Sequence, residues 1–377
     1  MSAITVGGEL VHYEVLGGGR PVVLVHGWLG AWRYWIPTMQ QLHMKYRVYA
    51  VDLFGFGDSS KSPHMYSIKQ QADMLDEFMD QLGISRAAFI GHGLGAMIVA
   101  EHAFRHQKEK VYRAMLVSPP LFDVDGLENR EPKRLSSKNS MSDTYGADPD
   151  RTIPSGTLEA TIPSAGMMRA ALLERAAARN RQAGKIPNPI QAASDDEPEQ
   201  SLLKDHLAGV MGTVDLYRML DICFSPKQIE HGKLLSDVRK TDSTVLHRTI
   251  DDFDAGKMLD TIQQLDMPYA IVHGVADKII PSPSDAILRY VKKITDQEER
   301  VYLNELGRFE NDEEAAERRE AEAARLENLR ELSHLPGDVG HFPMLEYERF
   351  GRLVNDFLEK SDVDDLGRRD RWRRRSR

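Results

Sequence analysis

Apolar residues in the first 120 positions alternate between short β-branched runs and longer stretches with helical spacing. Short apolar runs between turn residues are typical of buried strands, whereas a period of 3.6 residues is typical of helices. In the stretch 67–83, for example, Ile68, Ala72 and Leu75 share one helical face. This alternation predicts a mostly parallel sheet covered by helices. The expected strands are 10–17, 21–27, 46–53, 87–93 and 113–120, and the expected helices lie within 31–44, 67–83 and 96–110.

The pattern changes after Pro120, and residues 126–262 are predicted to form an insertion that acts as a helical lid. The insertion begins with a polar stretch that offers little to bury. Two helical segments, 166–184 and 201–224, follow within it. The sheet pattern resumes at PYAIVHG and ends before a helix expected at 346–360. The predicted core therefore consists of 1–125 and 263–360, and its last strand is either VYLNEL (301–306) or RELSHLPG (330–337), with attachment to GDVGHFP favouring the second.

Two charged segments interrupt or follow this core. Residues 308–332 are rich in Glu and Arg, which favours a solvated surface helix with many charge pairs. The tail 361–377 ends in RRDRWRRRSR, a basic end on a chain whose net charge is −9. Such tails are usually disordered, so a protein partner is the role left open for it and no specific nucleic-acid binding is expected.

Composition excludes several classes of protein. There is no run of eighteen apolar residues and no signal-peptide pattern, so we expect no membrane span and a cytoplasmic location. The single cysteine, Cys223, excludes an internal disulfide and a cysteine-based metal cluster. Neither a P-loop nor a dinucleotide fingerprint is present. We therefore expect no cofactor, and no metal, because no His and carboxylate cluster with metal-ligand spacing is evident.

The segments after the expected strands carry the candidate chemistry, since ligands of open α/β sheets bind beyond the carboxyl ends of the strands. The sequence IGHGLGA places glycines at Gly91, Gly93 and Gly95 in a sharp strand-to-helix turn. Enzymes that expose a nucleophile on such a turn carry Ser, Cys or Asp at the middle position. Here that position is Gly93, which has no side chain. The other segments are HGWLG, DLFGFGDSS, GVADKIIP and DVGHFPMLE.

Together, in this order, these motifs resemble the α/β-hydrolase fold superfamily, in particular its lipase, esterase and C–C hydrolase branch. The resemblance covers residues 5–120 and about 262–360, and it leaves the lid uncovered. It implies an α/β-hydrolase fold: a mostly parallel central sheet flanked by helices, with a helical lid insertion.

The resemblance also implies the site residues. It places the vacant nucleophile position at Gly93, the catalytic acid at Asp277 and the base at His341. The oxyanion hole would consist of the backbone N–H groups of Trp28 and Leu94. Two further histidines, His26 and His92, are expected to hold the oxyanion loop and the turn rather than to react.

Three other residues are weaker candidates. Ser118 or Cys223 could supply a nucleophile only by approaching His341, and Asp123 is a second choice to Asp277 as the acid.

Without a side chain at Gly93, an ordinary serine mechanism is excluded. One expectation is an enzyme in which His341 and Asp277 activate water against a small apolar ester or carbonyl compound bound under the lid. The alternative is an inactive pseudo-hydrolase that binds a ligand or serves as a scaffold.

Overall fold

The computed structural model describes residues 2–127, 130, 202–292, 334–335 and 339–360. An eight-stranded sheet forms the centre of this described part, in the order β1-β2-β4-β3-β5-β6-β7-β8. β2 is antiparallel to both β1 and β4, and the pairs from β4 to β8 are parallel. The strands are β1 Ser2–Val6, β2 Glu9–Leu16, β3 Arg20–Val25, β4 Tyr46–Val51, β5 Ala87–His92, β6 Val111–Val117, β7 Tyr269–Gly274 and β8 His334–Leu335.

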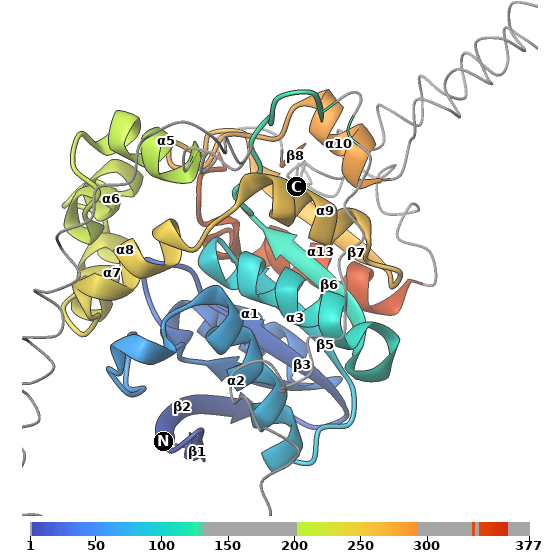
Figure 1. The fold of residues 1–377 in the computed structure, drawn as a ribbon. Helices are drawn as coiled ribbons and strands as arrows, with labels where there is room; N and C mark the ends of the chain where they lie inside the picture. The colour runs from blue at the N-terminus through green and yellow to red at the C-terminus, as the bar shows by residue number, and fades with distance from the viewer. Residues whose placement is uncertain (1, 128–129, 131–201, 293–333, 336–338, 361–377) are drawn as a thin grey trace, which may run out of the picture. The chain divides into compact units, whose positions relative to one another are not determined.

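Helices cover the sheet. α3 packs on β5 and β6 and is flanked by α2 and α9, and Figure 1 shows these three helices in front of the sheet. α1 and α13 contact each other, and α13 lies behind the sheet in Figure 1. The helices are η1 Trp32–Trp35, α1 Ile36–Leu42, η2 Pro63–Met65, α2 Ile68–Gln81, α3 Leu94–Lys110, α5 Leu202–Met211, α6 Leu216–Cys223, α7 Ile229–Val238, α8 Ser243–Asp251, α9 Ala255–Gln263, α10 Asp285–Val291, η4 Pro343–Leu345 and α13 Tyr347–Glu359.

The predicted fold class is confirmed, and the five strands expected before residue 120 correspond to β2 through β6. The last strand is β8, which lies in the RELSHLPG segment and pairs with β7. The other choice, 301–306, lies outside the described residues. The edge strand β1 was not predicted, because five residues with half-exposed positions give a weak pattern until β2 pairs with them.

The segment 201–224 is two helices rather than one. Gly212 takes a φ of 74°, which ends α5, and the Asp215 carboxylate accepts the Arg218 N–H at the start of α6. Of the predicted lid 126–262, the described helices are α5 to α9, a group that Figure 1 shows in yellow-green to gold. Within that group α9 packs on α3 and α10.

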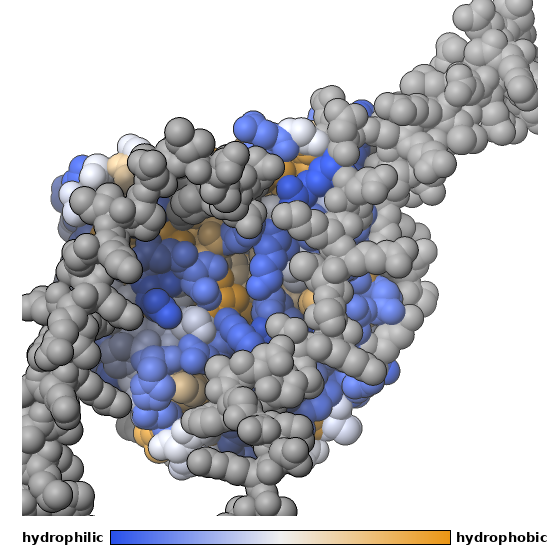
Figure 2. Space-filling model, in the orientation of Figure 1, coloured by the Kyte–Doolittle hydropathy of each residue, from blue (hydrophilic) through white to orange (hydrophobic). Residues whose placement is uncertain are grey.

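Other predictions fall on undescribed residues: the helix at 166–184, the charged segment 308–332 and the tail 361–377. Among the residues that the structure describes, no helix combines the length and apolar character needed to cross a membrane. On the face shown in Figure 2, the visible described residues are mostly hydrophilic, with hydrophobic ones exposed between them.

Candidate functional site

The candidate residues come from loops at the carboxyl ends of the parallel strands. His26 to Trp28 follow β3, Gly93 follows β5, Asp277 follows β7, and His341 precedes η4. Parallel strands end at the same edge of a sheet, so residues that are far apart in sequence meet there.

The turn after β5 holds Gly93 at φ 53° and ψ −114°, a conformation that side-chain-bearing residues rarely adopt. The Gly93 N–H donates to the Val117 carbonyl at 2.9 Å, which fixes the turn against β6. α3 begins immediately afterwards at Leu94.

The two flanking glycines are required by close packing, whereas Gly93 has room for a side chain. A Cβ on Gly91 would lie 2.2 Å from the Gly95 carbonyl oxygen, and one on Gly95 would lie 2.4 Å from that of Val25. At Gly93 the nearest atom to a Cβ would be 3.8 Å away. A Cβ at Gly93 would therefore lie at ordinary van der Waals distance from its neighbours, so the turn has room for a small side chain there.

His341 lies beside this position. Its Nε2 lies 3.8 Å from the Cβ position of Gly93, and its Nδ1 lies 2.8 Å from Asp277 Oδ2. Both side chains are almost fully buried. The carboxylate of Asp277 thus holds Nδ1 of the His341 ring, and Nε2 points towards the turn at Gly93.

Asp277 is held as an anion. Burial favours its neutral form, but the charge and hydrogen bond of His341 and the N–H groups of Ile280 and Ile279 outweigh burial and lower its pKa to about 2. These two N–H groups donate to Oδ1 at 3.0 and 2.8 Å, so Oδ2 is directed to His341.

The loop after β3 lies beside the same position. Trp28 Cε3 and Gly27 Cα are 3.9 and 3.8 Å from the Cβ position of Gly93. The described residues offer no hydrogen-bond acceptor to the backbone N–H groups of Trp28 and Leu94. N–H groups without a protein acceptor are what the predicted oxyanion hole requires, and that role of Trp28 and Leu94 stays a prediction.

A chain of hydrogen bonds fixes this loop to the segment that carries His341. The Gly27 N–H donates to Tyr34 Oη at 2.7 Å, and Tyr34 Oη is 3.1 Å from His92 Nδ1. His92 Nε2 lies 2.7 Å from the His341 carbonyl oxygen. Because a carbonyl only accepts, Nε2 carries the proton and Nδ1 accepts from the tyrosine. Burial lowers the pKa of His92 well below its usual value, in agreement with a neutral ring.

His26 joins the loops after β3 and β4. Its Nδ1 lies 2.8 Å from the Gly27 carbonyl, and its Nε2 accepts the Leu53 N–H at 3.0 Å. Burial lowers the pKa of His26 as well. Both histidines therefore contact backbone groups of the loops that carry the site.

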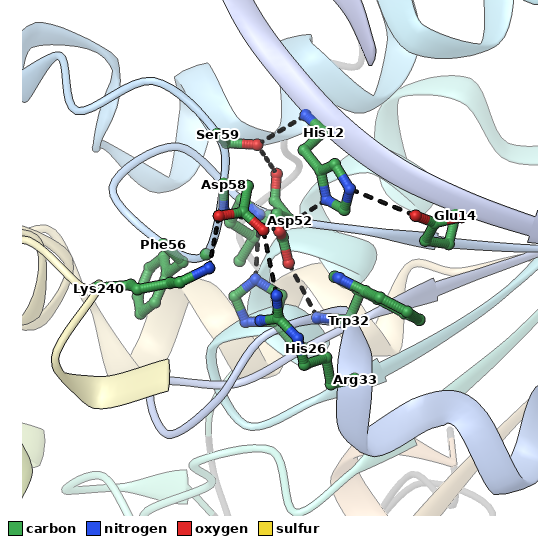
Figure 3. Close-up of polar contacts among 12 residues, drawn as sticks. His12, Glu14, His26, Trp32, Arg33, Asp52, Phe56, Asp58, Ser59 and Lys240 are labelled. Carbon is green, nitrogen blue, oxygen red and sulfur yellow. Dashed lines mark hydrogen bonds and ion pairs between the residues drawn. The ribbon is translucent and has the colours of Figure 1, made fainter. Parts of the chain in front are cut away.

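Asp52, at the start of the DLFGFGDSS segment, has a positioning role that the sequence did not reveal. Its buried carboxylate accepts the N–H groups of Trp32 and Asp58 at 2.8 and 3.0 Å and contacts His12 Nδ1 at 2.9 Å (Figure 3). Gly57, with φ 48°, is needed because a Cβ there would lie 2.2 Å from Asp52 Oδ2. Backbone contacts of this kind leave no signal in a sequence beyond the DxxGxGxS spacing.

His12, Asp52 and Asp58 also lie close enough together to suggest a metal site. Protein donors already occupy them: Arg33 and Lys240 contact Asp58 at 3.2 and 2.7 Å, in addition to the bonds at Asp52 (Figure 3). The group therefore fits a structural network better than a metal centre.

Helices of the predicted lid contact the site loops. Trp28 Nε1 donates to Thr249 Oγ1 of α8 at 2.9 Å, and His206 of α5 contacts the Ile279 carbonyl at 2.9 Å. The Phe224 ring, next to α6, lies 5.1 Å from that of Phe342. These contacts join the described part of the insertion to the loops of Trp28, Asp277 and His341.

The weaker candidates take other places. Ser118 follows Val117, which pairs with His92, but its buried Oγ has no hydrogen-bond partner within the described ranges and so none in His341. Burial and the charge of Asp277 raise the pKa of Cys223, which keeps its thiol protonated. Asp123 accepts from Ser284 at 2.6 Å, so Asp277 is the carboxylate bonded to His341.

The sequence matches the α/β hydrolase fold family over residues 20–151. Bifunctional epoxide hydrolase 2 of Sus scrofa is 39% identical over 142 residues, which are 36% of this chain and 24% of that protein. The chain thus spans about a quarter of the length of this curated relative.

Two solved structures resemble almost the whole chain. A mutant meta-cleavage product hydrolase from Pseudomonas fluorescens, complexed with acetates, has a TM-score of 0.51 at 18% identity and covers 96% of this chain and 98% of its own. A serine-to-glycine mutant of an N-acyl homoserine lactonase, complexed with N-hexanoyl homoserine lactone, has a TM-score of 0.50 at 19% identity, with coverages of 94% and 97%. At these identities the likeness concerns the fold.

Proposed function

We propose that this chain, which has the α/β-hydrolase fold and matches that family's model over residues 20–151, hydrolyses a small, largely apolar ester or carbonyl compound without a nucleophilic side chain. His341 and Asp277 act together as the base that activates a water molecule beside Gly93. One observation carries this proposal: the imidazole Nε2 of His341, oriented by Asp277, lies 3.8 Å from the position that a Cβ of Gly93 would occupy. A water oxygen bound to Nε2 there would take the place of the missing nucleophile.

The reaction then proceeds by direct addition of water. Nε2 of His341 takes a proton from the water, whose oxygen bonds to the carbonyl carbon while the carbonyl electron pair moves to its oxygen. The N–H groups of Trp28 and Leu94 donate to this oxyanion. When the carbonyl reforms, the bond to the leaving group breaks, and the leaving group takes the proton back from His341. No covalent enzyme intermediate forms.

The carboxylate of Asp277 supports both proton transfers. With a pKa of about 2 it stays ionised across the neutral range and stabilises the imidazolium that forms on His341. The Phe342 ring lies beside His341 and the Phe224 ring packs on it, which favours a largely apolar substrate.

The test is turnover of p-nitrophenyl esters and simple activated ketones. We expect His341→Ala and Asp277→Asn each to lower kcat/KM by roughly 10²- to 10⁴-fold, the usual contribution of general acid–base catalysis. His64→Ala, which removes an exposed histidine of η2, is the matched control and should leave the rate unchanged. Turnover that survives in both site variants would exclude His341 as the base.

A second function is favoured by the bound lactone in the serine-to-glycine mutant of the homoserine lactonase. That mutant holds a ligand in a fold of this kind with glycine introduced for serine, so a binding protein without turnover is the alternative. A Gly93→Ser variant separates the two, because it supplies a hydroxyl next to His341 Nε2. If only this variant hydrolyses the esters, and the original chain binds p-nitrophenyl butyl ether as judged by quenching of tryptophan fluorescence, the binding function is correct and the hydrolytic proposal is wrong.

A further inference from the structure

A second group of histidine and carboxylate side chains lies between α2 and α3, on the helix layer rather than in the site loops. It consists of Asp76 of α2 and of His102 and His106 of α3, with one ligand atom of each lying within 4.8 Å of the others. His102 and His106 are four residues apart, so they stand one turn apart on the same helix face. Their ring centroids are 4.8 Å apart, and His106 Nε2 is 3.6 Å from Asp76 Oδ1.

His102 is the unusual member of the group. Its side chain is fully buried, and neither ring nitrogen makes a hydrogen bond of normal geometry with any described residue. The Ala72 carbonyl is at most a weak acceptor for one ring N–H, which leaves the other ring nitrogen of His102 available. Buried polar groups are nearly always paired, so a buried imidazole with an available nitrogen beside a carboxylate and a second imidazole points to a ligand.

Two features make the group suitable for a metal ion. Burial lowers the pKa of His102 well below its usual value, and the neutral imidazole is the form that binds metals. The side chains of Asp76 and His106 are 28% and 25% exposed, which gives an ion a path from solvent.

One cation already competes for this group. Lys110 Nζ contacts Asp76 Oδ1 at 2.5 Å and Asp80 Oδ1 at 2.7 Å. Because Asp80 is a second partner, Lys110 keeps an ion pair if Asp76 turns towards an ion. Lys110 therefore occupies Asp76 in this structure, and it would keep Asp80 as its partner if a metal ion bound to Asp76.

We propose that Asp76, His102 and His106 bind a divalent transition-metal ion of the Zn²⁺ class and that the ion joins α2 to α3. Two imidazoles and one carboxylate match the ligands of such ions, with a fourth position left for water. Metal–ligand distances near 2.0–2.2 Å require the three ligand atoms to draw together by about 1 Å from their present spacing. The HAFRH segment places two histidines at i and i+4 on α3, but the carboxylate comes from α2, so the sequence alone showed no cluster of three ligands.

The first experiment is calorimetric titration of the full chain with ZnCl₂, followed by titration with CoCl₂ and visible spectroscopy. We expect one ion per chain, an absorption band of low-symmetry Co²⁺, and a rise in the melting temperature with zinc. His106→Ala and Asp76→Asn, which alter partly exposed side chains, should each weaken binding by roughly tenfold or more and abolish the zinc-dependent rise. His64→Ala is the control for binding by an exposed histidine, and circular dichroism checks that each variant is folded.

A Lys110→Gln variant gives the opposite expectation. Removing the competing ammonium should tighten zinc binding, because Asp76 no longer has to leave an ion pair. An affinity that is unchanged in His106→Ala and Asp76→Asn, or that falls in Lys110→Gln, would overturn the proposal. Loss of binding only in His341→Ala would assign the ion to the loop site instead.

Discussion

At the residue scale, the glycines of the GHGLG turn have different reasons for being glycine. Gly91 and Gly95 pass so close to backbone carbonyls that any Cβ would collide with them. Gly93 has space, and only its positive φ opposes a side chain. A glycine at this position therefore relieves backbone strain and at the same time removes the atom that would react.

This difference predicts the stability of alanine variants. Gly93→Ala should lower the free energy of unfolding by about 1–3 kcal/mol, the cost of holding a non-glycine residue in a strained conformation. Gly83→Ala is the control for a positive φ alone, since a Cβ there meets nothing within 4 Å. Gly91→Ala should cost more than either, because its Cβ would lie 2.2 Å from a carbonyl oxygen. Urea unfolding measures all three, and equal losses for Gly93→Ala and Gly91→Ala would contradict this account.

At the element scale, a buried side-chain hydrogen bond links α8 to the loop after β3. Trp28 Nε1 donates to Thr249 Oγ1, and both side chains are buried. Thr249 in turn donates to the Val245 carbonyl of its own helix at 2.8 Å. The bond thus connects the predicted lid insertion to a residue whose indole ring lies 3.9 Å from the Cβ position of Gly93.

Replacing Thr249 tests that link. Thr249→Val keeps the shape of the side chain but leaves the buried indole N–H without an acceptor, so we expect a loss of about 1–3 kcal/mol in unfolding free energy. Thr249→Ser keeps the hydroxyl and should recover most of that loss. Thermal or urea unfolding with near-ultraviolet circular dichroism of the tryptophans reports both effects. If the serine variant is as unstable as the valine variant, methyl packing rather than the hydrogen bond joins α8 to the loop.

The strands and first helices could be predicted because their signal is local. Each parallel strand is a short buried run, and α2 and α3 repeat apolar residues at helical spacing. Prediction failed where structure depended on a partner or on one backbone angle. β1 requires β2 beside it, and the separation of α5 from α6 depends on the φ of Gly212.

At the scale of the whole molecule, buried histidines that stay neutral lie both near the site loops and in the helix layer. Burial lowers the pKa values of His26, His92 and His102. His26 and His92 lie beside the site loops, and His102 lies between α2 and α3. His12 behaves in the opposite way, because its hydrogen bond to Asp52 raises its pKa despite burial. The two kinds of histidine act on stability in different ranges of pH.

These directions set the pH dependence of folding. Below about pH 6.5 the unfolded chain takes up a proton at each of the three buried histidines while the folded chain does not, so stability falls with decreasing pH. Three protons correspond to at most about 4 kcal/mol per pH unit. The bond of His12 to Asp52 stabilises the folded state fully below pH 6.5, and this stabilisation is lost as the pH rises through the raised pKa of His12 in the folded chain. The free energy of unfolding should therefore be greatest near neutral pH.

Urea unfolding between pH 5 and pH 8 measures this curve. A His102→Leu variant should reduce the slope below pH 6.5 by about one proton, or 1.4 kcal/mol per pH unit, whereas His64→Ala should leave it unchanged. A slope that is equal in the two variants would mean that His102 binds its proton in the folded state.

The sequence by itself determined the alternation of strands and helices, the order of the motifs and the identity of the candidate residues Gly93, Asp277 and His341, because these depend on local periodicity and on short patterns. Only the tertiary structure decided that Asp277 and not Asp123 contacts His341, that a Cβ fits at Gly93 but would collide at Gly91, and that Asp76 meets His102 and His106. The physical reason is that each of these facts is a distance between atoms on different elements. Such distances follow from how helices and loops pack on the sheet, and packing is fixed by many contacts at once rather than by any one segment.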